Sequence, residues 1–157
     1  MSHNEDLVRI LLYPLDNFSP DWAPANATPG SAGFDLRAAT EYATSINPGA
    51  WRAVPTGLIF VIPRGYEMQI RPRSGLALRL GLTVLNSPGT IDSDYRGEVA
   101  VILMNHSRES ITIKPGERIA QGVVQRVAKP VFLLQPAFEV PEGTLRGGGG
   151  FGSTGAA

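Results

Sequence analysis

Short apolar or alternating stretches recur along the chain, and each has the length of a β-strand rather than of a long helix. Most are rich in Val, Ile or Leu, side chains that favour a pleated, half-buried surface. Ile111 and Ile113 alternate with polar neighbours, which is the pattern of a strand with one buried face. The stretches that we expect to form strands are Val8–Tyr13, Leu58–Ile62, Glu67–Arg71, Leu82–Leu85, Glu98–Met104, Ser110–Ile113, Arg118–Val127 and Val131–Leu134.

Proline and glycine separate these stretches and predict where the chain turns, because proline presets φ and glycine accepts a positive φ. Many short strands with regular turns predict an all-β fold, either a sandwich, a jelly roll or a barrel. One short helix is expected at Ser74–Leu80, with Ser74 as its N-cap. The predicted turns lie at Pro29-Gly30, Pro48-Gly49, Pro63-Arg64-Gly65, Pro88-Gly89 and Pro115-Gly116.

The composition indicates one globular domain. The 157 residues suffice for a sizeable core, and the hydrophobic share of 43% excludes wholesale disorder. Lys plus Arg and Asp plus Glu both number 14, and this zero net charge argues against a nucleic-acid partner held through phosphates. The absence of cysteine excludes thiol catalysis, thiolate metal sites and disulfides. We expect a single domain over residues 1–157, with residues 1–6 disordered and residues 141–157 forming a flexible C-terminal arm.

The N-terminal sequence MSHNEDL is acidic, and neither a signal-peptide core nor an apolar run of membrane-spanning length follows it. We therefore expect a cytoplasmic protein with no membrane partner. The two histidines, His3 and His106, belong to no recognisable site, and we assign them no role.

Two groups near the predicted helix are candidates for chemistry. Asp35 stands between Phe34 and Leu36, so strand alternation would turn its carboxylate away from its apolar neighbours, although a turn-capping carboxylate explains it better. Arg73, Ser74 and Gly75 open the predicted helix, where free N–H groups bind anions and an arginine adds a bidentate phosphate donor. An ordinary capped helix with a surface arginine explains this triplet equally well.

The segment 85–101, LNSPGTIDSDYRGEVAV, concentrates more functional groups than a chain reversal needs. We expect strand-like runs to flank a hairpin turn at residues 86–89. Asn86 offers a donor and an acceptor, Tyr95 offers a flat face, and Asp92 can orient a water molecule. These groups suit a pocket for a nucleobase, and the alternative is a polar surface loop.

Two weaker signals lie nearer the C-terminus. Gln121 is a lone amide within an apolar stretch and needs a partner, which could be structural or a ligand. The stretch RGGGGFGSTG, residues 146–155, could be a disordered end, a nucleic-acid tail or part of an active site. It is not a Walker A loop, because Ser153 stands where the lysine should be.

Together, these five stretches follow the order and rough spacing of the five motifs of the trimeric deoxyuridine triphosphatases (dUTPases). The resemblance runs from about Val8 to Gly155, and GTIDSDYRG with the glycine-rich ending carries most of it. The resemblance implies a jelly-roll-like (β-clip) fold and a homotrimer with shared active sites. The C-terminal tail would be swapped onto a neighbouring subunit, and the twelve residues after Leu145 could span roughly 40 Å when extended.

The reaction implied by the resemblance is the hydrolysis of dUTP to dUMP and pyrophosphate, which removes dUTP from the nucleotide pool and supplies dUMP. Asp92 would activate the attacking water, and Mg²⁺ would bridge the phosphate oxygens, with Asp35 reaching the ion through a water molecule. Tyr95 would stack on the sugar, and Phe151 would cover the uracil ring. The resemblance implies these substrate-binding residues: Arg73, Ser74, Gly75, Asn86, Gly89, Thr90, Ile91, Tyr95, Ala100, Gln121, Arg146, Phe151, Gly152 and Ser153.

Two other functions are open at the level of sequence. The dCTP deaminases share the fold and a similar hairpin, but their catalytic glutamate would fall near Ile102, and isoleucine cannot transfer protons. A non-catalytic trimer that binds nucleotides or proteins is the other alternative, and Asp92 with the complete tail argues against it.

Overall fold

The computed structural model describes residues 7–134, and it is composed of short β-strands with one α-helix. Within this range no helix is long and apolar enough to cross a membrane. The elements are β1 (Leu11–Pro14), the 3-10 helix η1 (Pro20–Trp22), β2 (Phe34–Arg37), β3 (Thr44–Ile46), β4 (Trp51–Pro55), β5 (Leu58–Val61), β6 (Tyr66–Arg71), α1 (Ser74–Leu80), β7 (Leu82–Val84), β8 (Gly89–Ile91), β9 (Ala100–Asn105), β10 (Ile111–Ile113) and β11 (Arg118–Arg126).

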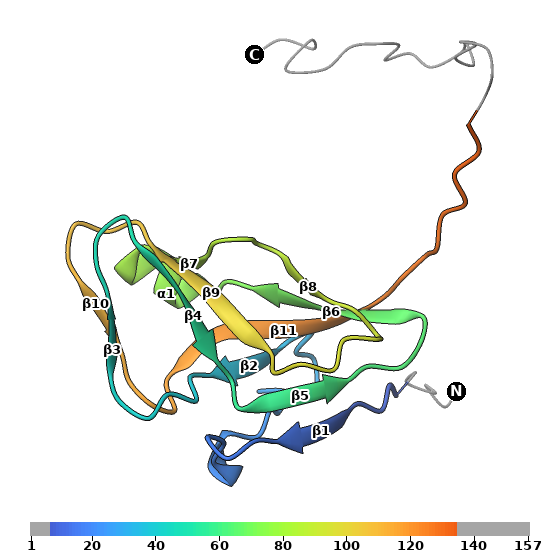
Figure 1. Ribbon diagram of the computed structural model, residues 1–157, viewed down its shortest axis with the longest axis horizontal. Helices are drawn as coiled ribbons and strands as arrows, with labels where there is room; N and C mark the ends of the chain where they lie inside the picture. Colours follow the sequence, from blue (N-terminus) through green and yellow to red (C-terminus); the bar gives the residue numbers. More distant parts are fainter. Residues whose placement is uncertain (1–6, 135–157) are drawn as a thin grey trace.

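The strands form two main antiparallel sheets, of order β2-β11-β6-β8 and β4-β9-β7. Two further pairs, β1-β5 and β10-β3, complete the domain, so the architecture is all-β and jelly-roll-like, as predicted. Figure 1 shows β11 running through the middle of the molecule, with β3 and β10 at one end and β1 beside β5 along one edge. The position of β11 between β2 and β6 decides which side chains meet at the candidate site.

The core lies between these sheets and follows the strand alternation. On β6, Met68 and Ile70 are buried while their neighbours are only half-buried, because successive side chains point to opposite faces. Phe34 and Phe60 stack with ring centroids 6.1 Å apart, and a Cβ at Gly122 would lie 2.7 Å from the Phe34 ring. Gly122 therefore lets β11 pass directly beneath this aromatic pair.

Most of the expected elements are confirmed, with shifted ends. The helix Ser74–Leu80 has the predicted bounds, but its N-cap is Arg73 and Ser74 is its first helical residue. The prediction of a strand at Val131–Leu134 was wrong, because these residues are in an extended coil with no partner strand in the described range and expose their side chains. The strands β2, β3, β4 and β8 were not among the predicted stretches.

Four of the five Pro-Gly turns are turns in the structure, and Gly49, Gly65 and Gly116 adopt positive φ there. At the fifth, Gly89 is instead the first residue of β8.

The two predicted stretches on either side of residues 86–89, Leu82–Leu85 and Glu98–Met104, cover β7 and most of β9, which pair antiparallel. β7, before these residues, pairs with β9, whereas β8, after them, pairs with β6 in the other sheet. Between β7 and β9 the chain therefore adds β8 to the other sheet, so the connection is longer than the predicted turn at residues 86–89.

Candidate active site

A hollow of about 320 Å³ lies beside the first turn of α1. It is lined by Asp35, Arg73, Ser74, Gly75, Arg79 and Gln121. These residues come from β2, from α1 with its N-cap, and from β11. Gln121 on β11 is opposite Asp35 on one side and Arg71 on the other, so the sheet register brings the distant segments together.

One carboxylate holds two arginines at this hollow. Arg73 Nε donates to Asp35 Oδ1 at 2.7 Å, and Arg118 Nη1 lies 3.4 Å from Asp35 Oδ2. The Arg73 and Asp35 side chains are 26% and 28% exposed, so the pair stands at the mouth of the hollow and not in the core. Asp35 thus orients Arg73. Because one carboxylate faces two arginines, a net positive charge remains at the solvent-exposed side of this group.

Gln121 has a structural partner. Its Nε2 donates to the carbonyl oxygen of Pro72 at 2.8 Å, which fixes the chain just before α1. One amide N–H remains for another acceptor, because a primary amide carries two donors. The first N–H groups of a helix also have no acceptor within the helix, so Ser74 and Gly75 present backbone donors next to these side chains.

A second hollow, of about 530 Å³, adjoins the first and shares Ser74 and Gln121 with it. Its other walls are Gln69, Arg71, Pro72, Ser87 and Pro88. Along β6, Gln69 Oε1 accepts from Arg71 Nη2 at 2.7 Å, so this wall is held in place by a side-chain hydrogen bond. The residues just before β8 therefore lie next to the start of α1.

The glycine at the start of β8 is closely surrounded by its neighbours. Gly89 is buried, and a Cβ there would lie 3.2 Å from Asn86 Nδ2 and 3.3 Å from Ile70 Cβ. Thr90 is exposed and Ile91 is half-buried, because they follow the alternation of β8. Only Thr90 of β8 is thus well exposed to solvent.

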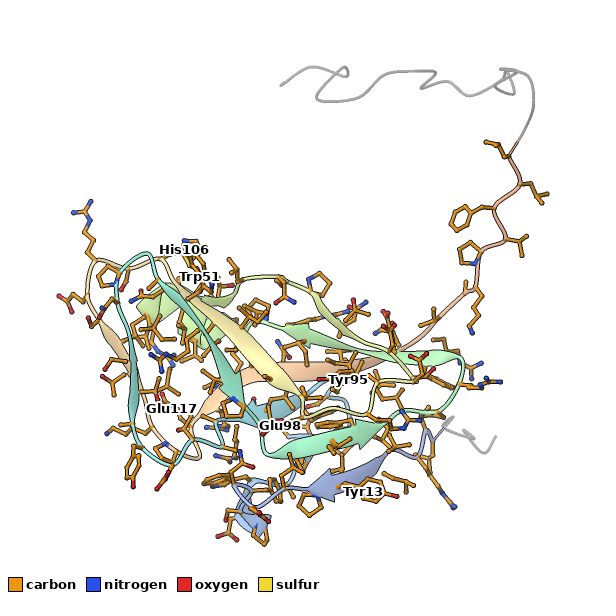
Figure 2. All side chains as sticks on the ribbon, viewed as in Figure 1. Tyr13, Trp51, Tyr95, Glu98, His106 and Glu117 are labelled. Carbon is orange, nitrogen blue, oxygen red and sulfur yellow. The ribbon has the colours of Figure 1, made fainter. Side chains whose placement is uncertain are left out.

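Asp92 and Tyr95 lie in the exposed turn after β8 and line neither hollow. The Tyr95 N–H donates to the Asp92 carbonyl, and the Tyr95 hydroxyl donates to the carbonyl oxygen of Glu98 at 2.9 Å. A Cβ at Gly97 would clash with the Tyr95 phenol, so the hydroxyl end of the ring lies close to that glycine. Figure 2 shows Tyr95 near the middle of the view, well away from α1 at one end of the molecule in Figure 1.

The structure therefore gathers Asp35, Arg73, Ser74, Gly75 and Gln121 and leaves Asp92 and Tyr95 on a separate surface. Ala100 is the exposed first residue of β9, and Ile102 is half-buried on the same strand. Arg146, Phe151, Gly152 and Ser153 lie outside the described residues. Sequence reasoning missed Arg79 and Arg118, although the spacing of four between Gly75 and Arg79 places both on one helix face.

A metal ion held by protein side chains alone does not fit the described residues. Within residues 7–134, no group of three or more His, Asp or Glu side chains could hold one. Asp35 is already engaged by Arg73 and Arg118. The site fits instead a Mg²⁺ ion that takes most of its ligands from phosphate oxygens and water, which is common for this ion.

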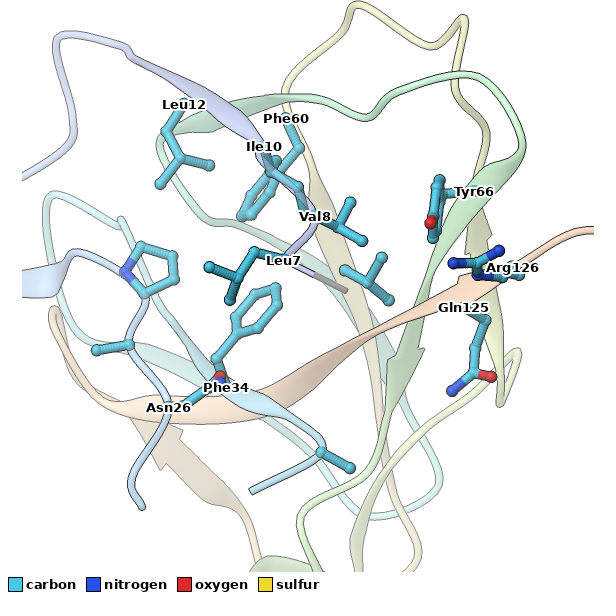
Figure 3. Close-up of a pocket in the computed structure, with 14 residues that line it drawn as sticks. Leu7, Val8, Ile10, Leu12, Asn26, Phe34, Phe60, Tyr66, Gln125 and Arg126 are labelled. Atoms are coloured by element: carbon cyan, nitrogen blue, oxygen red, sulfur yellow. The ribbon is translucent and has the colours of Figure 1, made fainter. Parts of the chain in front are cut away.

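A different hollow, of about 770 Å³, has walls that are partly apolar and partly polar, and it lies between the N-terminal strand and the sheet of β2, β11 and β6. Figure 3 shows Leu7, Phe34 and Phe60 there, with Tyr66 and Arg126 at one end. None of the site residues predicted within the described range lines it. Among residues 7–134, no Asp, Glu or His lines it.

The fold is all-β, and the polar hollow beside α1 presents arginine and backbone N–H donors of the kind that suit an anionic ligand. Residues 22–155 match the family model described as dUTPase. The chain therefore belongs to the dUTPase family. It is 45% identical over 150 residues to a deoxyuridine 5'-triphosphate nucleotidohydrolase of Maricaulis maris, covering 94% of this chain and 97% of that protein. It is 55% identical over 134 residues to the enzyme of the same name from Caulobacter vibrioides, covering 84% of each chain.

Solved structures confirm the fold. The dUTPase of Staphylococcus bacteriophage 80alpha with dUPNHPP superimposes with a TM-score of 0.81 at 24% identity, over 94% of this chain and 99% of that one. A mutant dUTPase from phage phi11 of S. aureus, with a structural Mg(II) ion, gives a TM-score of 0.72 at 20% identity. Its alignment covers 84% of this chain and 99% of that one.

Proposed function

We propose that this chain hydrolyses dUTP to dUMP and pyrophosphate. The observation that carries the proposal is the hollow beside α1, where Arg73 and the first helical N–H groups meet Gln121 around an accessible cavity. Charged and backbone donors of this kind suit phosphate oxygens. The names of the relatives and their high identity over most of the chain support the same substrate.

Arg73, Ser74, Gly75 and Gln121 would hold the triphosphate. Arg73 offers its remaining N–H groups, because Asp35 uses its Nε donor. Gln121 offers its second amide N–H while the first keeps Pro72 in place. Arg73 and Gln121 would thus each use one donor to hold the site in shape and another donor to bind the substrate.

Asp92 would act as the general base. Its carboxylate would take a proton from a water whose oxygen forms a bond to the α-phosphorus, and the bond from that phosphorus to the bridging oxygen would break, releasing pyrophosphate. Asp92 does not line the phosphate hollow within the described residues, which supports a site completed by another copy of the chain. We therefore propose a homotrimer in which Asp92 and the phosphate-binding residues come from different subunits.

Selection of the base and sugar would come from the segment around β8. Asn86, Gly89, Thr90, Ile91 and Ala100 would surround uracil, and Tyr95 would lie beneath the deoxyribose and exclude a 2′-hydroxyl. The anchored Tyr95 ring supports this role, because its hydroxyl donates to the Glu98 carbonyl and the same end of the ring lies close to Gly97. A site that matches the polar edge of uracil would leave buried groups unpaired with cytosine, at a cost of about 1–3 kcal/mol each.

The C-terminal tail would close the site of a neighbouring subunit. Arg146 would bind phosphate, Phe151 would cover the uracil, and Gly152 and Ser153 would contact the last phosphate. The direction of the preceding segment supports a swapped tail. Residues 127–134 leave the body of the molecule in Figure 1, and Phe132 and Leu134 are 88% and 99% exposed.

Mg²⁺ would enter with the substrate. It would neutralise charge on the phosphate oxygens, and Asp35 would reach it through water. The phi11 dUTPase structure with a structural Mg(II) ion supports a role for this ion in the family. The reaction would remove dUTP from the nucleotide pool and supply dUMP for thymidylate synthesis, in the cytoplasm.

The test is pyrophosphate release by the purified full-length chain with dUTP, dCTP, dTTP and UTP, each with Mg²⁺. We expect release with dUTP far above the other three. Ammonia release from dCTP would indicate a deaminase, and binding of dUTP without release would indicate a non-catalytic binding protein. Either result would overturn the proposed function.

A further inference from the structure

Arg79 contributes to the hollow beside α1 from the last turn of the helix. It follows Gly75 by four residues, so the two lie on the same helix face. The Arg79 guanidinium folds back over Gly75, where a Cβ would stand 3.1 Å from Nη2 and 3.2 Å from Nη1. A glycine at position 75 therefore leaves the space that the guanidinium occupies.

The charges at the hollow are unevenly paired. Arg73 and Arg118 share the carboxylate of Asp35. Among residues 7–134, no acceptor lies within hydrogen-bonding or ion-pairing distance of the Arg79 guanidinium. Arg79 is thus the uncompensated cation among the walls of this hollow, and it makes the site attractive to a ligand with several negative charges.

We infer that Arg79 binds phosphate and selects a polyphosphate over a monophosphate, an inference that rests on the proposed function. One phosphate group can be satisfied by Arg73 and the first N–H groups of α1. A second phosphate needs further donors, and the Arg79 guanidinium provides them beside Gly75. The volume of about 320 Å³ is of the order expected for a small-molecule site and exceeds the need of a single phosphate.

The experiment measures binding of inorganic pyrophosphate and of dUMP by calorimetry to the full-length chain and its variants. Arg79→Ala should weaken pyrophosphate binding about tenfold, the scale of one hydrogen bond to a charged group, and leave dUMP binding unchanged. Arg79→Lys should retain part of the affinity, because it keeps the charge and loses the bidentate geometry. Arg64→Ala is the matched control, since Arg64 is an exposed arginine at the turn between β5 and β6.

Arg79 is exposed, so its removal should not change the thermal midpoint. Unchanged pyrophosphate binding in Arg79→Ala would overturn the inference, as would an equal loss of pyrophosphate and dUMP binding. Binding needs no turnover, so the two proposals can fail separately. If the wild-type chain does not hydrolyse dUTP but Arg79→Ala weakens pyrophosphate binding, the proposed function fails and the inference stands.

Discussion

Asp35 on β2 and Arg73 at the N-cap of α1 form an ion pair of 2.7 Å, although they are 38 residues apart in the chain. The same carboxylate faces Arg118 at 3.4 Å. Asp35 therefore joins three segments, β2, the N-cap of α1 and β11, at the hollow beside α1. Because the two arginines differ in distance from Asp35 and in exposure, we expect the two ion pairs to differ in strength.

A double-mutant cycle should show weak coupling between Asp35 and Arg73. We expect a coupling free energy of unfolding of about 0.5 kcal/mol from Asp35→Asn and Arg73→Gln, because both side chains are partly exposed to water. The matched cycle with Arg118→Gln should give less, because Arg118 is more distant and 52% exposed. Urea denaturation at a fixed protein concentration measures both. Coupling of several kcal/mol would contradict this view of the pair as a surface interaction.

Replacing Asp92 by Asn should abolish most of the turnover without affecting the fold. Loss of the base should lower kcat by about 10²–10⁴, whereas Asp92 is exposed and its replacement should leave the thermal midpoint in place. Steady-state kinetics and calorimetry with a non-hydrolysable dUTP analogue separate chemistry from binding. Asp94→Asn is the control, because Asp94 is exposed in the same turn. Equal losses of kcat in both variants would contradict the assignment of Asp92 as the general base.

Tyr95 should decide between deoxyribose and ribose through its ring and not through its hydroxyl. Tyr95→Ala should raise the ratio of kcat/KM for UTP to that for dUTP, because the ring no longer blocks the 2′-hydroxyl. Tyr95→Phe keeps the ring against Gly97 and loses only the hydrogen bond to Glu98. We expect its ratio to stay near that of the wild type. An unchanged ratio in the alanine variant would show that another residue excludes ribose.

A shared active site predicts rescue between two defective chains. The Asp92→Asn chain and a chain truncated before Arg146 should each be nearly inactive alone. After the two are refolded together, some mixed trimers would combine an intact Asp92 with an intact tail, and part of the dUTP turnover should return. Mass measurement of the mixed trimers provides the control. Mixed trimers without activity would reject the shared site.

Gly122 should be sensitive to the smallest possible side chain. Gly122→Ala places a Cβ about 2.7 Å from the Phe34 ring, and relieving this overlap should cost about 1–3 kcal/mol of unfolding free energy. Gly30→Ala is the control, because no atom lies within 4 Å of a Cβ at that position. Thermal or urea denaturation would compare them. Equal stability of the two variants would mean that the stacked pair of Phe34 and Phe60 moves aside freely.

Several of the strands and turns and the residue types of the candidate site could be predicted from the local sequence alone. Alternating apolar residues predicted strands such as β6, because a two-residue period buries one face wherever the strand lies. Positive-φ turns at Gly49 and Gly116 follow from glycine itself. The residue types of the candidate site could also be chosen from sequence, since arginine and free helical N–H groups suit phosphate in any fold.

Tertiary structure decided the pairings and the meeting of distant groups. β2, with the sequence FDLR, and β3, with TSI, are too short and mixed for a local signal, and only burial against β11 and β10 makes them strands. Val131–Leu134 shows the converse, because its apolar side chains find no partner strand among the described residues. The separation of Asp92 from Arg73 also depends on β8 pairing with β6. Such long-range pairings are chosen by the burial of whole sheet faces, which no local stretch of sequence encodes by itself.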